Sequence, residues 1–354
     1  MNWKMSLISI GLFTLVSGPV AAESGSEITH DMIVSDAFED NKIGTAPERN
    51  IQVYLPPDYG QTDRAYPVIY YLHSFFEDES TLFDTYDGKA HIDAAITSGH
   101  LDPVIVVAAD FSTPTGGGFY TSSPVTGDWL SFIADDLVAH IDATYRTLPQ
   151  PGARGIFGQH AGAYGAIRIA SRRPDAFGVV YGMHPVATGH GNILMQSRPD
   201  WDALAAAETL EDVKGNFLNE IFTIIYQANL PNPKRPPLYF DPPATREDGQ
   251  LIMDPALTEK LQQSFFLERH VGDYAENLKR LRAFKFDWGR HDGNQDHVYS
   301  NQFYSRKLNE FGVPHEAEEY NGGWVDGMFN KGGRIETDVL PFFQRHLAFE
   351  EDLS

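Results

Sequence analysis

The residues whose spacing is most informative for chemistry lie between Gly155 and Gly162, in the run Gly-Ile-Phe-Gly-Gln-His-Ala-Gly. A short β-type run leads into this segment and a helical pattern follows it. Gly158 and Gly162 flank His160 because a β-carbon at either position of a sharp strand-to-helix turn would collide with its neighbours. Such a turn, a nucleophile elbow, presents its central side chain at the edge of a sheet. Here the presented group is the imidazole of His160.

A neutral imidazole, with an ordinary pKa near ~6.5, acts as a nucleophile or as a general base. Asp292 follows a strand-like run and supplies a carboxylate at the same sheet edge. We predict that His160 contacts Asp292, which would fix the imidazole tautomer and stabilise the imidazolium. Backbone N–H groups of Ala161 and of the Ser74/Phe75 turn are the expected donors to a developing oxyanion.

The elements that must position these residues alternate between apolar runs of strand length and helical stretches. Continuous apolar runs suit central parallel strands, and the in–out alternation of residues 51–55 suits an outer antiparallel strand. This order predicts an α/β fold with a mostly parallel sheet and helices on both faces. We expect strands at 51–55, 67–72, 103–109, 155–158, 177–181 and 284–288, and helices at 129–145, 163–171 and 340–347.

Residues from about 187 to 282 break the alternation. They contain helical patterns and the Pro-rich stretch 230–243, but no convincing strand. We interpret this segment as a helical cap over the carboxyl edge of the sheet, where such folds bind ligands. A structural decoration without a binding role is the alternative. The rest of the chain, from residue 23 to 354, is predicted to form one domain that contains the cap.

Composition restricts location and partners. Residues 1–22 read as a secretory signal peptide, with Lys4 before an apolar stretch and Val20-Ala21-Ala22 as the cleavage site, which predicts a periplasmic or secreted protein without a membrane span. The chain has no cysteine, which excludes a thiol nucleophile and disulfides. The formal charge of −22 argues against nucleic acid and anionic membranes as partners. The Gly-rich loop 116–118 lacks the lysine of a phosphate-binding loop, and no organic cofactor is expected.

The chain resembles the esterase family that includes S-formylglutathione hydrolases, feruloyl esterases, siderophore esterases and the antigen 85 mycolyltransferases. The resemblance extends from about residue 48 to 346 and implies an α/β-hydrolase fold. It also implies hydrolysis of a carboxylic ester or acyl transfer, on a small-molecule or polymer-linked ester. Besides the elbow, the matching motifs are Tyr54-Leu-Pro-Pro-Asp-Tyr59, Tyr66-Pro-Val-Ile-Tyr-Tyr-Leu-His73, residues 137–147, Arg172-Arg-Pro-Asp-Ala-Phe-Gly178 and Phe311-Gly-Val-Pro-His315.

The family pattern is altered at three catalytic positions. His160 replaces the nucleophilic serine, Trp324 replaces the histidine after a Gly-rich turn, and His73-Ser74 replaces a His-Gly pair. Only Asp292 matches the family residue, so an ordinary Ser-His-Asp mechanism is ruled out. We expect four residues to lie on the substrate side of the site, namely Phe75, Gln159, His184 and Trp324.

Two other interpretations stay open. Loss of both nucleophile and base is expected when an esterase becomes a non-catalytic binding protein, because function lies in the site and not in the fold. Alternatively, His184, His291 and His297 could join Asp292 in a zinc site. The spacings of these residues match no compact ligand motif, so no metal is predicted.

Overall fold

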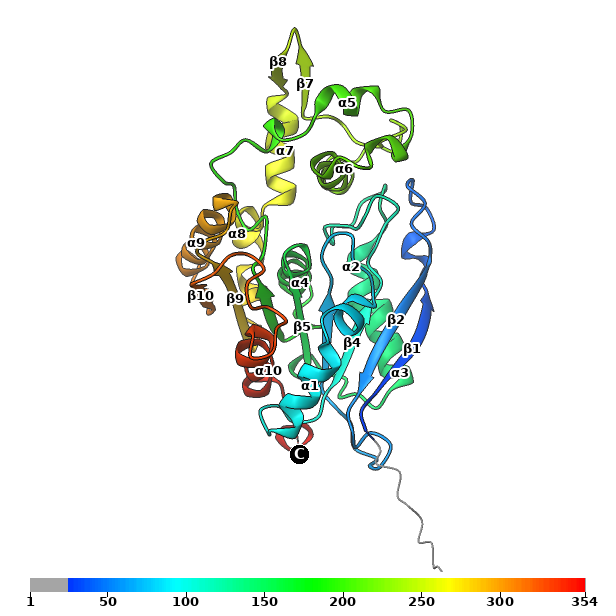
Figure 1. The fold of residues 1–354 in the computed structure, drawn as a ribbon, viewed down its shortest axis with the longest axis vertical. Coiled ribbons are helices and arrows are strands. Elements are labelled where there is room, and N and C mark those ends of the chain that lie inside the picture. Colours follow the sequence, from blue (N-terminus) through cyan, green and yellow to red (C-terminus); the bar gives the residue numbers. More distant parts are fainter. Residues whose placement is uncertain (1–24, 354) are drawn as a thin grey trace, which may run out of the picture.

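The computed structural model describes residues 25–353. The predicted signal peptide, residues 1–22, lies outside the described residues, so its cleavage stays a prediction. The described chain is built around one large sheet with helices on both of its faces and a separate group of elements beyond one edge (Figure 1).

The large sheet has eight strands in the order β1-β2-β4-β3-β5-β6-β9-β10. The strands are β1 (Glu27–Val34), β2 (Glu48–Leu55), β3 (Val68–Leu72), β4 (Ile105–Ala109), β5 (Arg154–Gln159), β6 (Val179–Met183), β9 (Ala283–Gly289) and β10 (Glu316–Tyr320). Only the β1–β2 and β2–β4 pairs are antiparallel. The pairs from β4 to β10 are parallel, as their continuous apolar sequences predict for most of them. The predicted fold class is confirmed.

Alternate strand residues face two cores, one on each side of the sheet. On β3, Tyr70 and Leu72 pack into one core, and Ile69 and Tyr71 into the other. The first core is covered by α2 (Trp129–Ser131), α3 (Val138–Thr144), α4 (Ala161–Arg172), α8 (Leu267–Leu278) and α9 (Gln295–Glu310). The second core is covered by α1 (Gly88–Thr97) and α10 (Leu340–His346).

The segment between β6 and β9 forms most of the group beyond the sheet. It contains α5 (Trp201–Ala206), α6 (Phe217–Asn229), β7 (Ala244–Glu247), β8 (Gln250–Met253), α7 (Pro255–Phe265) and α8. Figure 1 shows α5, α6, α7 and the β7–β8 hairpin together at the top of the molecule. They contact loops that follow the carboxyl ends of the central strands: Thr115 donates a hydrogen bond to Gln227 on α6 (3.2 Å), and the Phe76 and Phe217 rings lie 6.0 Å apart.

The sequence-based expectations are wrong in three places. The cap segment contains a hairpin, β7–β8, although no strand was expected there. β2 is antiparallel but not outermost, because β1 pairs with its other edge. The helical stretch 129–145 is interrupted by a π-helical turn at Phe132–Leu137, which an apolar spacing near 3.6 does not distinguish from α-helix.

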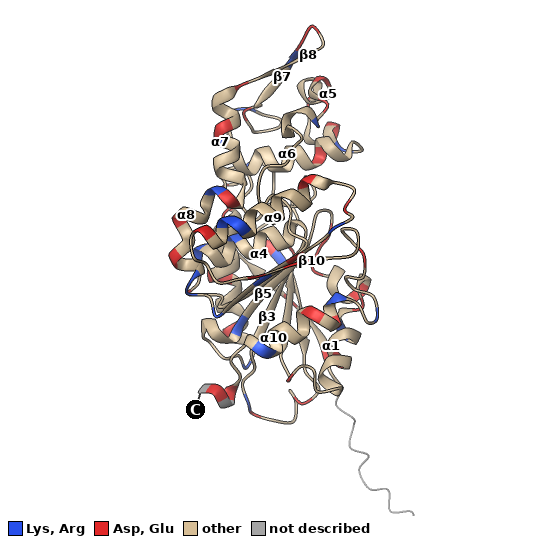
Figure 2. Cartoon of the chain, turned by 90° about the vertical axis from the view of Figure 1, so that its left-hand side faces the viewer, with Lys and Arg blue, Asp and Glu red and all other residues tan. Residues whose placement is uncertain are grey.

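In the part of the chain that the structure describes, no helix has the length and apolar character needed to cross a membrane. In Figure 2, Lys and Arg residues (blue) are interspersed along the chain with Asp and Glu residues (red).

Candidate active site

His160 occupies the centre of the elbow between β5 and α4. Its backbone has φ 48° and ψ −109°, a region that non-glycine residues rarely adopt. A β-carbon at Gly158 would lie 2.4 Å from the Leu72 carbonyl oxygen, and one at Gly162 only 1.9 Å from the same atom. Both positions therefore require glycine, and the close approach of β3 and α4 holds His160 in its strained conformation.

The His160 ring is buried between Trp324 and His184. Only 5 % of His160 is exposed. The Trp324 ring lies over it with a centroid distance of 4.1 Å, and the His184 ring packs edge-on at 5.7 Å. Nε2 of His160 lies 3.4 Å from the Trp324 carbonyl oxygen. Burial, followed by the electrostatic interaction with the neighbouring His184, lowers the pKa of His160 to about 3, so the imidazole is neutral near pH 7.

Asp292 lies in the loop after β9 and is bound by two other imidazoles. Its Oδ2 accepts from His184 Nε2 at 2.8 Å and from His297 Nδ1 at 2.7 Å, and its Oδ1 accepts from the Asn294 N–H at 2.7 Å. Burial alone would raise the pKa of Asp292, but the hydrogen bonds from His184 and His297 outweigh it and hold the pKa well below its ordinary value. Asp292 is therefore a carboxylate.

The predicted contact between His160 and Asp292 is wrong. Among the described residues there is no hydrogen bond between these two side chains, and the nitrogen of His184 fills the place expected for the His160 ring. The reason is the position of His184, directly after β6, which lies between β5 and β9 in the sheet. The His184 imidazole, which follows the intervening strand, therefore hydrogen-bonds the Asp292 carboxylate in place of the His160 imidazole.

The tautomer of His184 follows from its surroundings. Its Nδ1 accepts a hydrogen bond from the Gly289 backbone N–H at 3.0 Å, so the ring proton must be on Nε2, which donates it to Asp292. His184 has no exposed surface, and both of its nitrogens are engaged. It was expected on the substrate side; instead it supports the His160 ring and holds Asp292.

A metal site at this place conflicts with that tautomer. His184, Asp292 and His297 have ligand-type atoms within 4.8 Å of one another. A neutral histidine that binds a metal through Nε2 carries its proton on Nδ1 and donates it outward. At His184 the Nδ1 atom faces an N–H donor instead. His291, the other residue considered for zinc, is exposed and bonds Asn321 at 2.8 Å. The donor set therefore does not fit a zinc ion.

Backbone donors for an oxyanion are present on both sides of the elbow. Ala161 is the first residue of α4, so its N–H has no partner within the helix. The Ser74 N–H, a second expected donor, is already used by the Glu77 carboxylate at 2.8 Å. The neighbouring Phe75 N–H makes no hydrogen bond within residues 25–353. Of the expected donors, the N–H groups of Ala161 and Phe75 are therefore the ones without a partner among the described residues.

Gln159 does not lie free on the substrate side, as expected, because its amide belongs to an internal network. Its Nε2 donates to Glu77 at 3.0 Å and to the Tyr86 hydroxyl at 2.8 Å, and Gln159 is only 3 % exposed. Tyr86 also donates to Glu77 at 2.6 Å. This network ties the β3 loop, which carries Phe75, to the elbow, which carries Ala161.

Aromatic side chains surround the entrance to the elbow. Trp324 is 41 % exposed, so it covers His160 from the solvent side and does not fill core volume. Phe75 is half-buried against Phe119, with ring centroids 4.8 Å apart. Phe76 and Phe217 are exposed neighbours from the β3 loop and from α6. A separate cavity of about 420 Å³ lies among the cap elements, with Trp201 and Phe240 in its walls.

Two residues of this site were not identified from the sequence as functional neighbours. His297 was considered only as a metal ligand, although its position in the first turn of α9, five residues after Asp292, brings it back onto the carboxylate. Glu77 was not singled out at all. Its signal is weak, because an acidic residue in a loop is ordinarily solvated.

Comparison with known proteins finds a match to an esterase family over part of the chain. Residues 44–214 match the model of the family described as "Putative esterase". An esterase of Mycobacterium tuberculosis is 32% identical over 142 residues, 38% of this chain and 28% of that protein. An endo-1,4-beta-xylanase/feruloyl esterase of Xylanibacter ruminicola is 29% identical over 163 residues, 43% of this chain and 21% of that protein. The chain thus matches less than a third of the length of either relative.

Solved structures match nearly the whole chain in fold. A ferulic acid esterase superposes with a TM-score of 0.62 at 18% identity, over 91% of this chain and 99% of that one. An S-formylglutathione hydrolase from Agrobacterium tumefaciens gives a TM-score of 0.56 at 17% identity, over 92% and 97% of the two chains. The predicted α/β-hydrolase fold is confirmed, and the two sequence relatives carry the names of esterases.

Proposed function

From its place in the esterase family over residues 44–214, we propose that the protein hydrolyses, or transfers the acyl group of, a carboxylic ester at His160. The observation that carries this proposal is the elbow itself. A neutral imidazole occupies the position of the reacting residue, directly before Ala161, whose N–H has no partner within α4. The substrate class is a small-molecule or polymer-linked ester.

The proposed step uses His160 as a nucleophile. The Trp324 carbonyl lies closest to Nε2, which favours a proton on Nε2 and a lone pair on Nδ1. The lone pair attacks the ester carbonyl carbon, and the electron pair passes to the carbonyl oxygen near Ala161 and Phe75. Collapse breaks the ester C–O bond and releases the alcohol, which takes a proton from solvent. Water, or a second alcohol, then removes the acyl group from the imidazolium.

Asp292 does not orient His160 directly, as the acid of a His-Asp pair would. Its contacts with His184 keep that ring against His160, so it supports the nucleophile through an intervening side chain. The lowered pKa of His160, about 3, keeps its imidazole neutral near pH 7, so that a lone pair is available for attack.

A second candidate function is binding of an ester or acid without turnover. One observation favours it: Trp324 stacks on His160 at 4.1 Å and covers the ring that must react. Turnover of p-nitrophenyl acetate separates the two functions. We expect wild type to exceed buffer, and His160→Ala to fall to the buffer rate. Equal rates for wild type, His160→Ala and Asp292→Ala, all at the buffer level, would leave only the binding function.

We also propose that the protein is exported, on the basis of the signal-peptide pattern in residues 1–22. The intact mass of protein secreted by a bacterial host tests this. The mature chain should begin at Glu23, and a full-length mass in the exported fraction would contradict cleavage.

A further inference from the structure

Asp292 holds two imidazoles, and only one of them, His297, has a partly exposed side chain. His184 is fully buried, with both nitrogens engaged. The His297 side chain is 20 % exposed and contacts Asp292 through Nδ1 only. A carboxylate bonded to Nδ1, with Nε2 left for another partner, is the arrangement of a base histidine in a serine triad. In this chain the histidine that contacts the carboxylate through Nδ1 is His297, on α9.

The surroundings of His297 select the tautomer of a base. The Asn294 amide nitrogen lies 2.8 Å from Nε2 and donates to it. The Asn294 oxygen faces Arg198, at 3.5 Å, which fits this orientation of the amide. Nε2 of His297 therefore carries the lone pair, and Nδ1–H donates to Asp292. A water that replaces the Asn294 amide would meet an acceptor ready for its proton.

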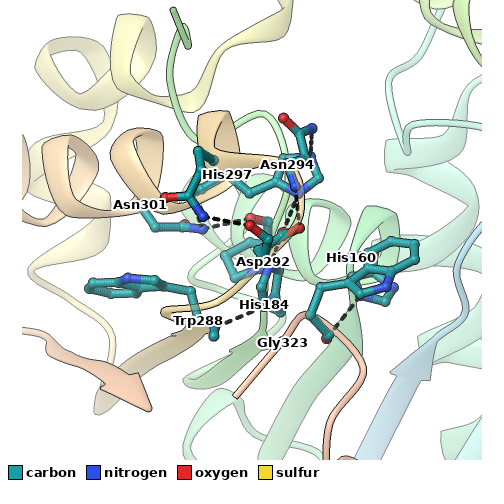
Figure 3. A network of polar contacts seen from close by, with 12 residues as sticks. His160, His184, Trp288, Asp292, Asn294, His297, Asn301 and Gly323 are labelled. Carbon is teal, nitrogen blue, oxygen red and sulfur yellow. Dashed lines mark hydrogen bonds and ion pairs between the residues drawn. The ribbon is translucent and has the colours of Figure 1, made fainter. Parts of the chain in front are cut away.

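The backbone of His297 is fixed to the segment that carries His184. The buried Asn301 amide donates to the His297 carbonyl and to the Pro185 carbonyl, both at 2.9 Å. The His297 and His184 rings are 6.0 Å apart, and the His184 and His160 rings 5.7 Å apart. The three rings form one cluster (Figure 3).

We infer that His297, oriented by Asp292, is the general base for the water that releases the acyl group from His160. This inference rests on the proposed function. Nε2 of His297 takes one proton from water while the water oxygen attacks the acyl carbon. The carbon–nitrogen bond to His160 breaks, its electron pair returns to the imidazole, and the acid leaves. His297 then gives its proton to solvent. His297 thus replaces the family histidine whose position Trp324 occupies.

A stopped-flow burst experiment with p-nitrophenyl acetate isolates this step. The nitrophenolate leaving group needs no proton, so acylation of His160 gives a first phase that does not require His297. We expect His297→Gln to keep the burst amplitude and to slow the second phase by about 10²-fold, the usual contribution of a general base. Asp292→Asn, which keeps both imidazoles but removes the acceptor of Nδ1–H, should slow the same phase.

His291→Gln is the matched control, because His291 lies in the same loop, is exposed and bonds Asn321 instead of Asp292. It should leave both phases unchanged. A wild-type second phase in both His297→Gln and Asp292→Asn would overturn the inference. So would loss of the burst in a variant that unfolds at the wild-type temperature, because His297 would then act before release. Failure of the proposed function is distinguishable: wild type would show no burst, or His160→Ala would retain it.

Discussion

A buried imidazole in a strained turn makes stability depend on pH. The pKa of His160 falls from about 6.5 in the unfolded chain to about 3 in the fold, so between these values the unfolded chain binds more protons. The contribution of the neutral ring to the free energy of unfolding is present above pH 6.5 and is lost as the pH falls toward 3. Lowering the pH from 7 to 5 should cost about 2 kcal/mol through this residue.

His160→Gln measures that contribution. Urea unfolding at pH 7 and pH 5 should show a smaller loss of stability in the variant than in wild type, by about 2 kcal/mol. His100→Gln is the control, because His100 is exposed. His270, whose pKa is also lowered by burial, contributes equally to both proteins. An identical pH dependence of wild type and His160→Gln would contradict a buried, neutral ring.

Metal removal is the second test at the level of single residues. Nδ1 of His184 accepts an N–H, so Nε2 has no lone pair for a cation. Dialysis against EDTA should therefore leave both ester turnover and the melting temperature unchanged. Activity that disappears on dialysis and returns with zinc would contradict the assigned tautomer.

Sequence reasoning located the site but not its contacts. The glycine spacing around His160 and the position of Asp292 after a strand were sufficient to bring both residues to one sheet edge. They did not reveal that His184 takes the carboxylate, because this depends on the order of strands, with β6 between β5 and β9. The hydrogen bond from the Ser74 N–H to Glu77 could likewise not be predicted, because it depends on side-chain geometry.

Among the secondary-structure elements, the elbow is the one least tolerant of change. Gly162→Ala would put a β-carbon 1.9 Å from the Leu72 carbonyl oxygen, a backbone atom that β3 holds in place. We expect a loss of at least about 3 kcal/mol, measured by urea unfolding. Gly60→Ala is the control, since a β-carbon there meets nothing within 4 Å. Equal stability of the two variants would show that β3 and α4 are less closely packed than described.

The elements predicted from the sequence are those buried on both faces. β3, β4 and β6 are apolar runs, β5 and β9 are mixed but largely buried, and all five lie centrally. The edge strands β1 and β10 were not predicted, because their sequences, EITHDMIV and EAEEY, are largely polar and partly exposed. The β7–β8 hairpin was missed because each of its strands has only four residues and β7, ATRE, is largely polar.

At the scale of the whole molecule, a buried ion pair joins the sheet to its last helical segment. Arg334 donates to Asp287 at 2.8 Å and 3.1 Å, and Asp287, on β9, has no exposed surface. Tyr181, on β6, donates to the same carboxylate at 2.7 Å. Arg334→Met would leave a buried charge without its cation, and we expect a loss of about 3–5 kcal/mol.

The control for Arg334→Met is Lys214→Met, which removes an exposed ion pair with Glu211 and should change stability by less than about 1 kcal/mol. Adding Asp287→Asn to Arg334→Met should restore part of the loss, since the uncompensated charge is then gone. Thermal unfolding compares the four proteins. A Lys214→Met loss equal to that of Arg334→Met would contradict a buried pair.

The most direct test of the central claim, that His160 is the reacting residue of the elbow, is mass spectrometry of protein quenched in acid during turnover of p-nitrophenyl acetate. We predict one added acetyl group on the peptide that contains His160, present in the wild type, more abundant in His297→Gln and absent from His160→Ala. Acetyl found only on other residues, or equal labelling of the His160→Ala protein, would contradict the claim.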